Sequence, residues 1–147
     1  MKKFLYIPLL LIISSCGFYT FSGASISAEI KNIKIGYFIN EAENFKANLD
    51  RDITQKLTDF IIEQTDLSVN NDNYEIEING KIISYDIIPI SISSNDFANQ
   101  NRLSISVNID FKNYISEKDN YNQKFTRYAD YKSDQNLEEI ESELTDQ

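Results

Sequence analysis

Residues 101–113 read NRLSISVNIDFKN, and this stretch decides the expected fold. Its apolar side chains are Leu103, Ile105, Val107, Ile109 and Phe111. The polar side chains between them are Arg102, Ser104, Ser106, Asn108, Asp110 and Lys112. A period of two is typical of a β-strand with one face against a core and the other in water. We therefore expect a sheet that is covered on one face only.

A second long strand is predicted to begin at Tyr74. Its apolar residues alternate with polar ones and then change parity between Gly80 and Ser84. One extra residue in a strand produces such a change, so a β-bulge is expected there. Pro89 lacks an N–H and is expected to end the pairing or to mark a sheet edge.

Shorter patterns complete the sheet and its connections. A short strand is expected at 30–37, with Gly36 as a point of close approach or a bulge, and residues 67–69 form an extended segment. Residues 90–100 are expected to be a polar loop, and residues 117–120 a turn. A last strand is predicted at 121–131.

Two stretches have the period of an amphipathic helix. The first begins at Leu49, has Asn48 as its expected N-cap, and should end near Thr65. The second starts at Leu137 and continues its apolar stripe through Ile140 and Leu144.

The order strand, helix, three strands, helix predicts an α+β fold. A strand–helix–strand start implies a right-handed crossover and a parallel pair, while turns make the later strands antiparallel. We expect a two-layer sandwich, in which two helices cover one face of a mixed four-stranded sheet.

The N-terminus has the form of a bacterial lipoprotein signal. Two lysines precede an apolar run of ten residues that is too short for a membrane span, which needs about 20. The tetrapeptide Ile13-Ser14-Ser15-Cys16 then matches a lipobox. We expect a signal peptide at 1–15, lipid on Cys16, a tether at 16–28 and one domain at 29–147. The alternatives are an ordinary signal with a chance cysteine, or a buried apolar strand.

The charge of the mature chain excludes several partners. Removing residues 1–15 changes the formal charge from −9 to −11. Such a chain is not attracted to nucleic acid or to anionic lipid, so membrane attachment has to come from acyl chains on Cys16. Gly17 does not favour retention in the inner membrane. An outer-membrane position facing the periplasm is expected.

The composition offers little catalytic chemistry. The chain has no histidine, and its one cysteine is expected to carry lipid, so nucleophilic triads and the usual zinc sites are excluded. Glu75 and Glu77 alternate with apolar residues and are predicted to be solvated. Glu138, Glu139 and Glu141 are predicted to lie at the start of a helix. We expect no enzyme, no metal and no cofactor.

Three segments resemble a known family. They are residues 16–26 (CGFYTFSGASI), residues 101–107 (NRLSISV), and residues 125–131 (FTRYADY) with Gln135-Asn136-Leu137 after them. In this order and spacing they resemble the LptE lipoproteins of lipopolysaccharide assembly, in the form found in the Bacteroidetes group. Their last helix usually extends further than Gln147, so we expect a truncated sequence or a minimal helix.

The resemblance implies an outer-membrane lipoprotein that plugs the β-barrel translocon LptD and helps to place lipopolysaccharide in the outer leaflet. Basic residues are candidate contacts with lipopolysaccharide phosphates or with the barrel, although cross-strand pairing with Asp110 or Asp130 is favoured for them. Tyr128, beside Arg127, is a candidate barrel contact. The alternative is that residues 127–131 are a strand end whose aromatic side chains cover the core. The basic candidates are Arg102, Lys112, Lys124 and Arg127.

Two other functions stay open from the sequence. One is a periplasm-facing adaptor lipoprotein that regulates a cell-envelope enzyme or machine. The other is a small ligand-binding lipoprotein of a transporter.

Overall fold

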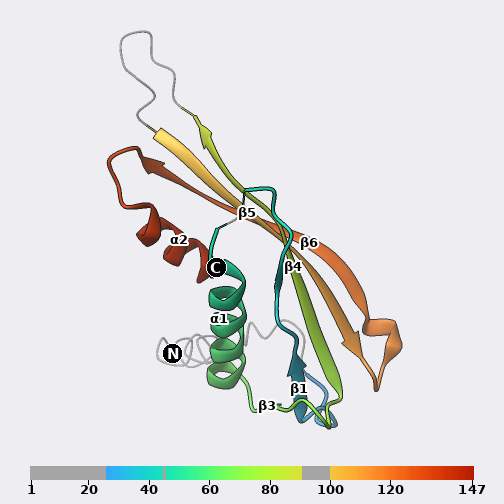
Figure 1. The fold of residues 1–147 in the computed structure, drawn as a ribbon. Coiled ribbons are helices and arrows are strands. Elements are labelled where there is room, and N and C mark those ends of the chain that lie inside the picture. Colours follow the sequence, from blue (N-terminus) through green and yellow to red (C-terminus); the bar gives the residue numbers. More distant parts are fainter. Residues whose placement is uncertain (1–25, 45, 91–99) are drawn as a thin grey trace, which may run out of the picture.

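One mixed sheet lies against two helices in the computed structural model, which describes residues 26–44, 46–90 and 100–147 (Figure 1). The helices are α1 (Leu49–Gln64) and α2 (Leu137–Thr145), with a short 3-10 helix η2 (Glu117–Asp119). The strands are β1 (Asn32–Ile35), β2 (Ile39–Asn40), β3 (Ser68–Val69), β4 (Ile76–Pro89), β5 (Gln100–Asn113) and β6 (Tyr121–Lys132).

The sheet has the order β3-β1-β4-β5-β6, and β2 pairs with β4 beyond the end of β1. β1 is parallel to β4, with α1 in the connection between them, as the strand–helix–strand pattern predicts. β4, β5 and β6 are antiparallel to one another. The α+β class is confirmed. The predicted count of four strands is wrong, because β2 and β3 add two strands of two residues each.

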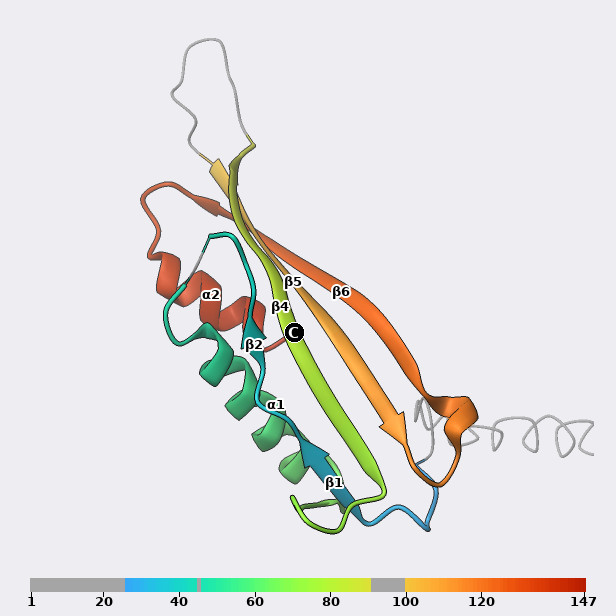
Figure 2. The same ribbon diagram turned by 45° about the vertical axis from the view of Figure 1, so that its right-hand side comes forward.

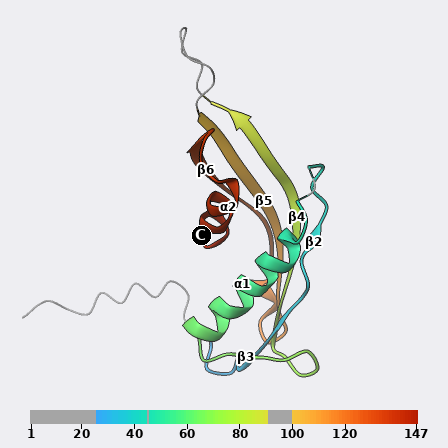
Figure 3. The ribbon, with the colours of Figure 1, turned by 60° about the vertical axis from the view of Figure 1, so that its left-hand side comes forward.

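Both helices pack on the same face of the sheet (Figure 3). The larger apolar core lies between them and β4, β5 and β6, and its most buried side chains are Phe38, Ile82 and Leu103. A smaller cluster, with Ile33 at its centre, joins β1 to the end of α1. The wet face predicted from residues 101–113 is therefore the face without helices.

The predicted bulge is present in β4. The pairing with β5 shifts between Ile82 and Ser84, so Ile83 is the extra residue. Ile82 and Tyr85 consequently both face the core, although they lie three positions apart. Pro89 is the last residue of β4, as predicted.

The segment predicted as one strand at 30–37 is divided in the structure. Gly36 donates its N–H to the Ile78 oxygen at 2.8 Å, and the chain then leaves the sheet before β2. Phe38 instead enters the core and lies against Gly80, where a Cβ would come within 2.1 Å of the ring. Gly80 is thus a point of close approach that the sequence did not predict. Gly36, for which close approach was predicted, is tight as well, because an added Cβ there would lie 2.1 Å from Asn79 Oδ1.

The predicted helices are both present. Asn48 has the expected N-cap position, but its φ of 65° is left-handed and its side chain makes no capping bond. Asn136 caps α2, since its side chain accepts the Glu138 N–H. Neither helix in the described ranges is long and apolar enough to cross a membrane.

Three expectations concern residues outside the described ranges. They are the signal peptide at 1–15 with the lipid on Cys16, most of the tether at 16–28, and most of the loop at 90–100.

Candidate functional site: the open polar face of the sheet

The face without helices, called here the open face, is built by every second residue of three long strands. The register of β4, β5 and β6 puts polar side chains opposite one another along most of its length. Because the three strands are antiparallel and only β4 has a bulge, these rows stay aligned. On β4 and β5 the open face includes Glu77, Lys81, Ser84, Arg102, Ser104, Ser106, Asn108, Asp110 and Lys112; on β6 it has Asn122, Lys124, Thr126, Tyr128 and Asp130.

An arginine–carboxylate pair occupies the end of the open face near the start of β5. Arg102 donates from Nε and Nη2 to both oxygens of Asp130, at 2.6 and 2.8 Å. Its guanidinium also lies 4.0 Å from the centre of the Tyr128 ring. The arginine holds the pKa of the Asp130 carboxyl below its usual range. The predicted cross-strand pairing of Arg102 is therefore present.

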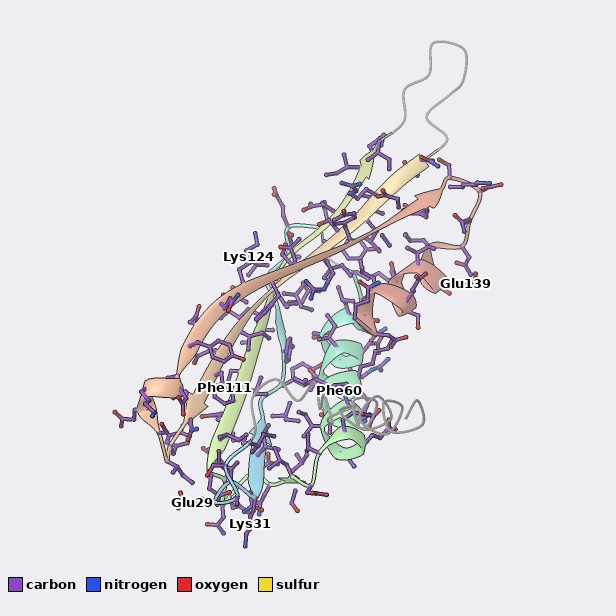
Figure 4. All side chains as sticks on the ribbon, turned by 180° about the vertical axis from the view of Figure 1, so that it is seen from behind. Glu29, Lys31, Phe60, Phe111, Lys124 and Glu139 are labelled. Carbon is purple, nitrogen blue, oxygen red and sulfur yellow. The ribbon has the colours of Figure 1, made fainter. Side chains whose placement is uncertain are left out.

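The middle of the open face is a ladder of neutral polar pairs. Ser106 and Thr126 share a hydrogen bond of 2.8 Å, and the Asn108 amide donates to Asn122 at 3.0 Å. Lys124 projects from β6 on the side away from both helices (Figure 4). It makes no ion pair with any described residue.

A buried carboxylate forms the other end of the face, where Glu77 was predicted to be solvated. That prediction is wrong, because Glu77 is only 7% exposed. It receives Lys34 Nζ at 2.9 Å and the Tyr114 hydroxyl at 2.7 Å. Together Lys34 and Tyr114 lower the pKa of Glu77 to about 2, and Glu77 raises the pKa of Tyr114 to about 12. Lys34 comes from a different strand, so alternation within β4 alone could not reveal the pair.

The structure separates the five residues predicted as contacts into two sets. Arg102, Lys112, Lys124 and Tyr128 all lie on the open face, with Lys112 beside Asp110 at 3.6 Å. Arg127 has the opposite parity and faces the helices, where it lines an apolar groove of about 220 Å³ with residues of α1, β5 and α2.

A second buried carboxylate lies on the helix side and was not predicted. Glu141 of α2 is 8% exposed, accepts the Tyr85 hydroxyl, and pairs with Lys46 Nζ at 3.0 Å. Burial, followed by the bond to Glu141, raises the pKa of Tyr85. The signal was in the sequence, since residue 141 follows Leu137 by four positions and so lies on the apolar stripe.

Three of the described carboxylates that the sequence singled out, Glu75, Glu77 and Glu141, are thus engaged in structural bonds. Glu75 accepts the N–H groups of Lys31 and Asn32 at 3.0 and 2.7 Å, and Glu77 and Glu141 each hold a lysine and a tyrosine. Within the described ranges, no three potential ligands gather in a way that could hold a metal ion. The arrangement is suited to hydrogen bonding over a broad surface.

A family comparison matches almost all of the described chain. The model of the family LptE, described as lipopolysaccharide-assembly, matches residues 30–147. These residues include both helices and all strands of the sheet. No curated protein matches the sequence.

Solved structures share this fold at low sequence identity. PelC of Paraburkholderia phytofirmans, solved as a dodecamer, has a TM-score of 0.52 and 10% identity, over 85% of this chain and 89% of that one. The uncharacterized lipoprotein B of Nitrosomonas europaea has a TM-score of 0.51 and 15% identity, over 84% and 83%. At these identities the likeness concerns the fold.

Proposed function

The chain belongs to the LptE family of lipopolysaccharide-assembly lipoproteins, and from this premise we propose that it is the plug and partner of an LptD-type outer-membrane β-barrel. Together they place lipopolysaccharide in the outer leaflet. The role requires no catalytic step by this chain, because a plug acts through binding and position.

The observation that carries the proposal is the open face. The lumen of a large outer-membrane barrel is polar and wet, so a plug needs a surface that exchanges hydrogen bonds with it. The open face offers amides, hydroxyls and charged groups on three strands, and no described helix covers it. Among its basic members, Arg102, Lys112 and Lys124 are the candidates for contact with lipopolysaccharide phosphates, which attract cations.

The location follows from the proposed lipid on Cys16. The chain has a net charge of −9, or −11 without residues 1–15, so it gains no attraction from an anionic membrane surface and acyl chains have to hold it there. Each buried CH₂ contributes about 0.8 kcal/mol, and stable anchoring needs more than one chain. We expect Cys16→Ala to abolish incorporation of alkyne-labelled palmitate. Retention of the label in that variant would refute lipidation at Cys16.

Co-purification tests the partner. The full chain carries a C-terminal affinity tag and is purified from detergent-solubilised outer membrane, with Cys16→Ala as the control for membrane delivery. We expect a large β-barrel to co-purify with the unmodified sequence and to be depleted with the variant. If the tagged chain reaches the outer membrane and brings down no barrel, the plug role is wrong and an adaptor role gains support.

A further inference from the structure

β6 is the last strand on its side of the sheet, and no described element pairs with its outer edge (Figure 2). It is twelve residues long, and its pairing with β5 continues without a shift from Tyr121 to Lys132. It contains no proline. Natural edge strands are commonly shortened, bulged, interrupted by proline or covered, because a free edge invites another strand. In the described ranges β6 has none of these protections. Charged side chains, which also discourage pairing between two copies, are its one protection.

The hydrogen bonds at one end of β6 show which backbone groups point outward. Lys132 donates its N–H to Gln135 Oε1 at 2.7 Å, and its oxygen accepts the Gln135 N–H at 2.9 Å. The backbone oxygen of Gln100, which is paired with Lys132, accepts the N–H of Ile90 at 3.0 Å, and Ile90 follows directly after β4. Lys132 and Gln100 therefore form a pair without mutual hydrogen bonds, and the backbone groups of Lys132 face away from β5.

The same parity holds for every second residue of the strand, because orientation alternates along an antiparallel pair. Five further residues thus present an N–H and a C=O to the outside. One of these outward groups has a hydrogen-bond partner among the described residues. Arg127 Nη1 donates to the Thr126 oxygen at 3.2 Å. The five residues are Asn122, Lys124, Thr126, Tyr128 and Asp130.

The charge of this edge is opposite to that of the chain. β6 carries Lys124, Arg127 and Lys132 but one acid, Asp130, in a chain of net charge −9. Asp130 is already held by Arg102. The three cations of β6 form no ion pair with the described residues, whereas most lysines and arginines elsewhere do. Lys124 and Arg127 lie on opposite faces, so they flank the edge on both sides.

We propose that the outer edge of β6 is a strand-addition site for an extended, carboxylate-bearing segment of a partner protein. The segment forms main-chain hydrogen bonds with residues 122–130, and its acidic side chains lie near Lys124 on the open face and Arg127 on the helix face. A second copy of this chain is a poorer occupant, since two β6 edges would bring six basic side chains together. The inference is independent of the barrel role proposed above.

A matched pair of variants separates the contribution of backbone hydrogen bonds to peptide binding from the contribution of the Lys124 charge. Lys124→Ala and Lys124→Pro both remove the ammonium group, but proline also removes an outward N–H and puts its ring into the edge. Because this N–H is not used toward β5, proline is tolerable at this position, as in natural edge strands. Protection of the inward amides of Gln123 and Phe125 from exchange verifies that the ladder remains in both variants.

The probe is a ten-residue peptide of alternating valine and glutamate, added to the mature lipidated chain in detergent. Amide hydrogen exchange followed by NMR is the main readout. We expect the peptide to slow exchange at Lys124, Thr126 and Tyr128. Lys124→Ala should weaken binding about threefold, as for an exposed charge. Lys124→Pro should weaken it about tenfold more, as for lost hydrogen bonds in a partly desolvated edge.

Two further peptides keep the test decisive if Lys124→Pro does not fold. The same valine–glutamate peptide with alternate amides methylated should not bind, and a valine–lysine peptide should bind at least about tenfold more weakly. Binding without protection of the outward amides would overturn the proposal, and so would equal binding of the lysine peptide. A third result would also overturn it. If the outward amides become protected from exchange as the protein concentration rises, with no peptide present, a second copy of the chain occupies the edge.

Discussion

At the scale of single residues, the stability of the open face depends most on Glu77. A carboxylate this buried is stable only with partners, and Lys34 and Tyr114 supply one charge and one hydroxyl. The pair joins β1 to β4, and Tyr114 extends it to the residue after β5. An interaction on the solvent side of the sheet therefore holds three chain segments together.

The pH dependence of stability should reveal this carboxylate. Its pKa in the folded chain is about 2, below the ordinary 4.5, so its contribution is complete above about pH 5 and is lost as pH falls toward 2. At 1.36 kcal/mol per pKa unit, this contribution is about 3 kcal/mol. Urea unfolding between pH 7 and pH 2.5 measures it.

Glu77→Gln is the matched variant, because it keeps the shape and an acceptor for Tyr114 and removes the charge. We expect it to be less stable by about 1–3 kcal/mol at pH 7, and the difference should shrink below pH 4. The pKa of Tyr114 should also fall toward 10, seen as an earlier absorbance change in alkaline titration. A constant difference down to pH 2.5 would contradict this assignment.

Two glycines give a paired prediction about packing. At Gly80 an added Cβ would lie 2.1–2.4 Å from three atoms of the Phe38 ring, which is 1% exposed and has nowhere to move. At Gly36 the nearest atom is Asn79 Oδ1, at the end of a side chain that can rotate. We expect Gly80→Ala to lower the free energy of unfolding by about 1–3 kcal/mol, and Gly36→Ala to lower it by less than about 1 kcal/mol. Thermal unfolding compares them, and equal losses would contradict the close approach at Gly80.

At the scale of elements, α2 is short and depends on a few contacts. Its apolar residues Ile140 and Leu144 enter the larger core, and Glu141 connects it to Tyr85 of β4 and to Lys46. Lys56 of α1 also donates to the Ser142 oxygen at 2.9 Å, near the C-terminal end of α2, where a positive charge is favoured. The helix is therefore held by specific polar bonds as much as by buried area.

Removal of one hydroxyl should loosen α2. Tyr85→Phe leaves the buried Glu141 without its tyrosine donor, at a cost of about 1–3 kcal/mol. Amide exchange should then rise in α2 more than in α1. Tyr37→Phe is the control, because the Tyr37 hydroxyl donates to Asp50 at the surface. Its removal should change the free energy of unfolding by no more than about 0.5 kcal/mol. If both variants behave alike, the buried bond does not hold α2.

The elements that the sequence predicted are those with long periodic patterns. Residues 101–113, the parity change after Gly80 and the stripe from Leu49 each repeat often enough to identify a strand, a bulge and a helix. β2 and β3 have two residues each, too few for a pattern. The burial of Glu77 was missed for another reason, since its partners come from other segments and are known only once the sheet is formed.

At the scale of the whole molecule, the two faces of the sheet differ in polarity and in what covers them. One face packs the helices over an apolar core, and the other carries paired polar groups along three strands. The sequence predicted this asymmetry from the alternation at 101–113. Arg127 was grouped with the other basic candidates, although it has the parity of the apolar residues Phe125 and Ala129 and the register turns it toward the helices.

Site-specific photo-cross-linking tests the central claim that the open face meets the barrel. A photoreactive residue replaces Asn108, in the middle of the open face, or Gln55, which is exposed on α1. Both variants are expressed in the native membrane and irradiated. We predict a cross-link to a large β-barrel from position 108 that is much stronger than from position 55. Cross-linking to the barrel from position 55 but not from position 108 would contradict the account.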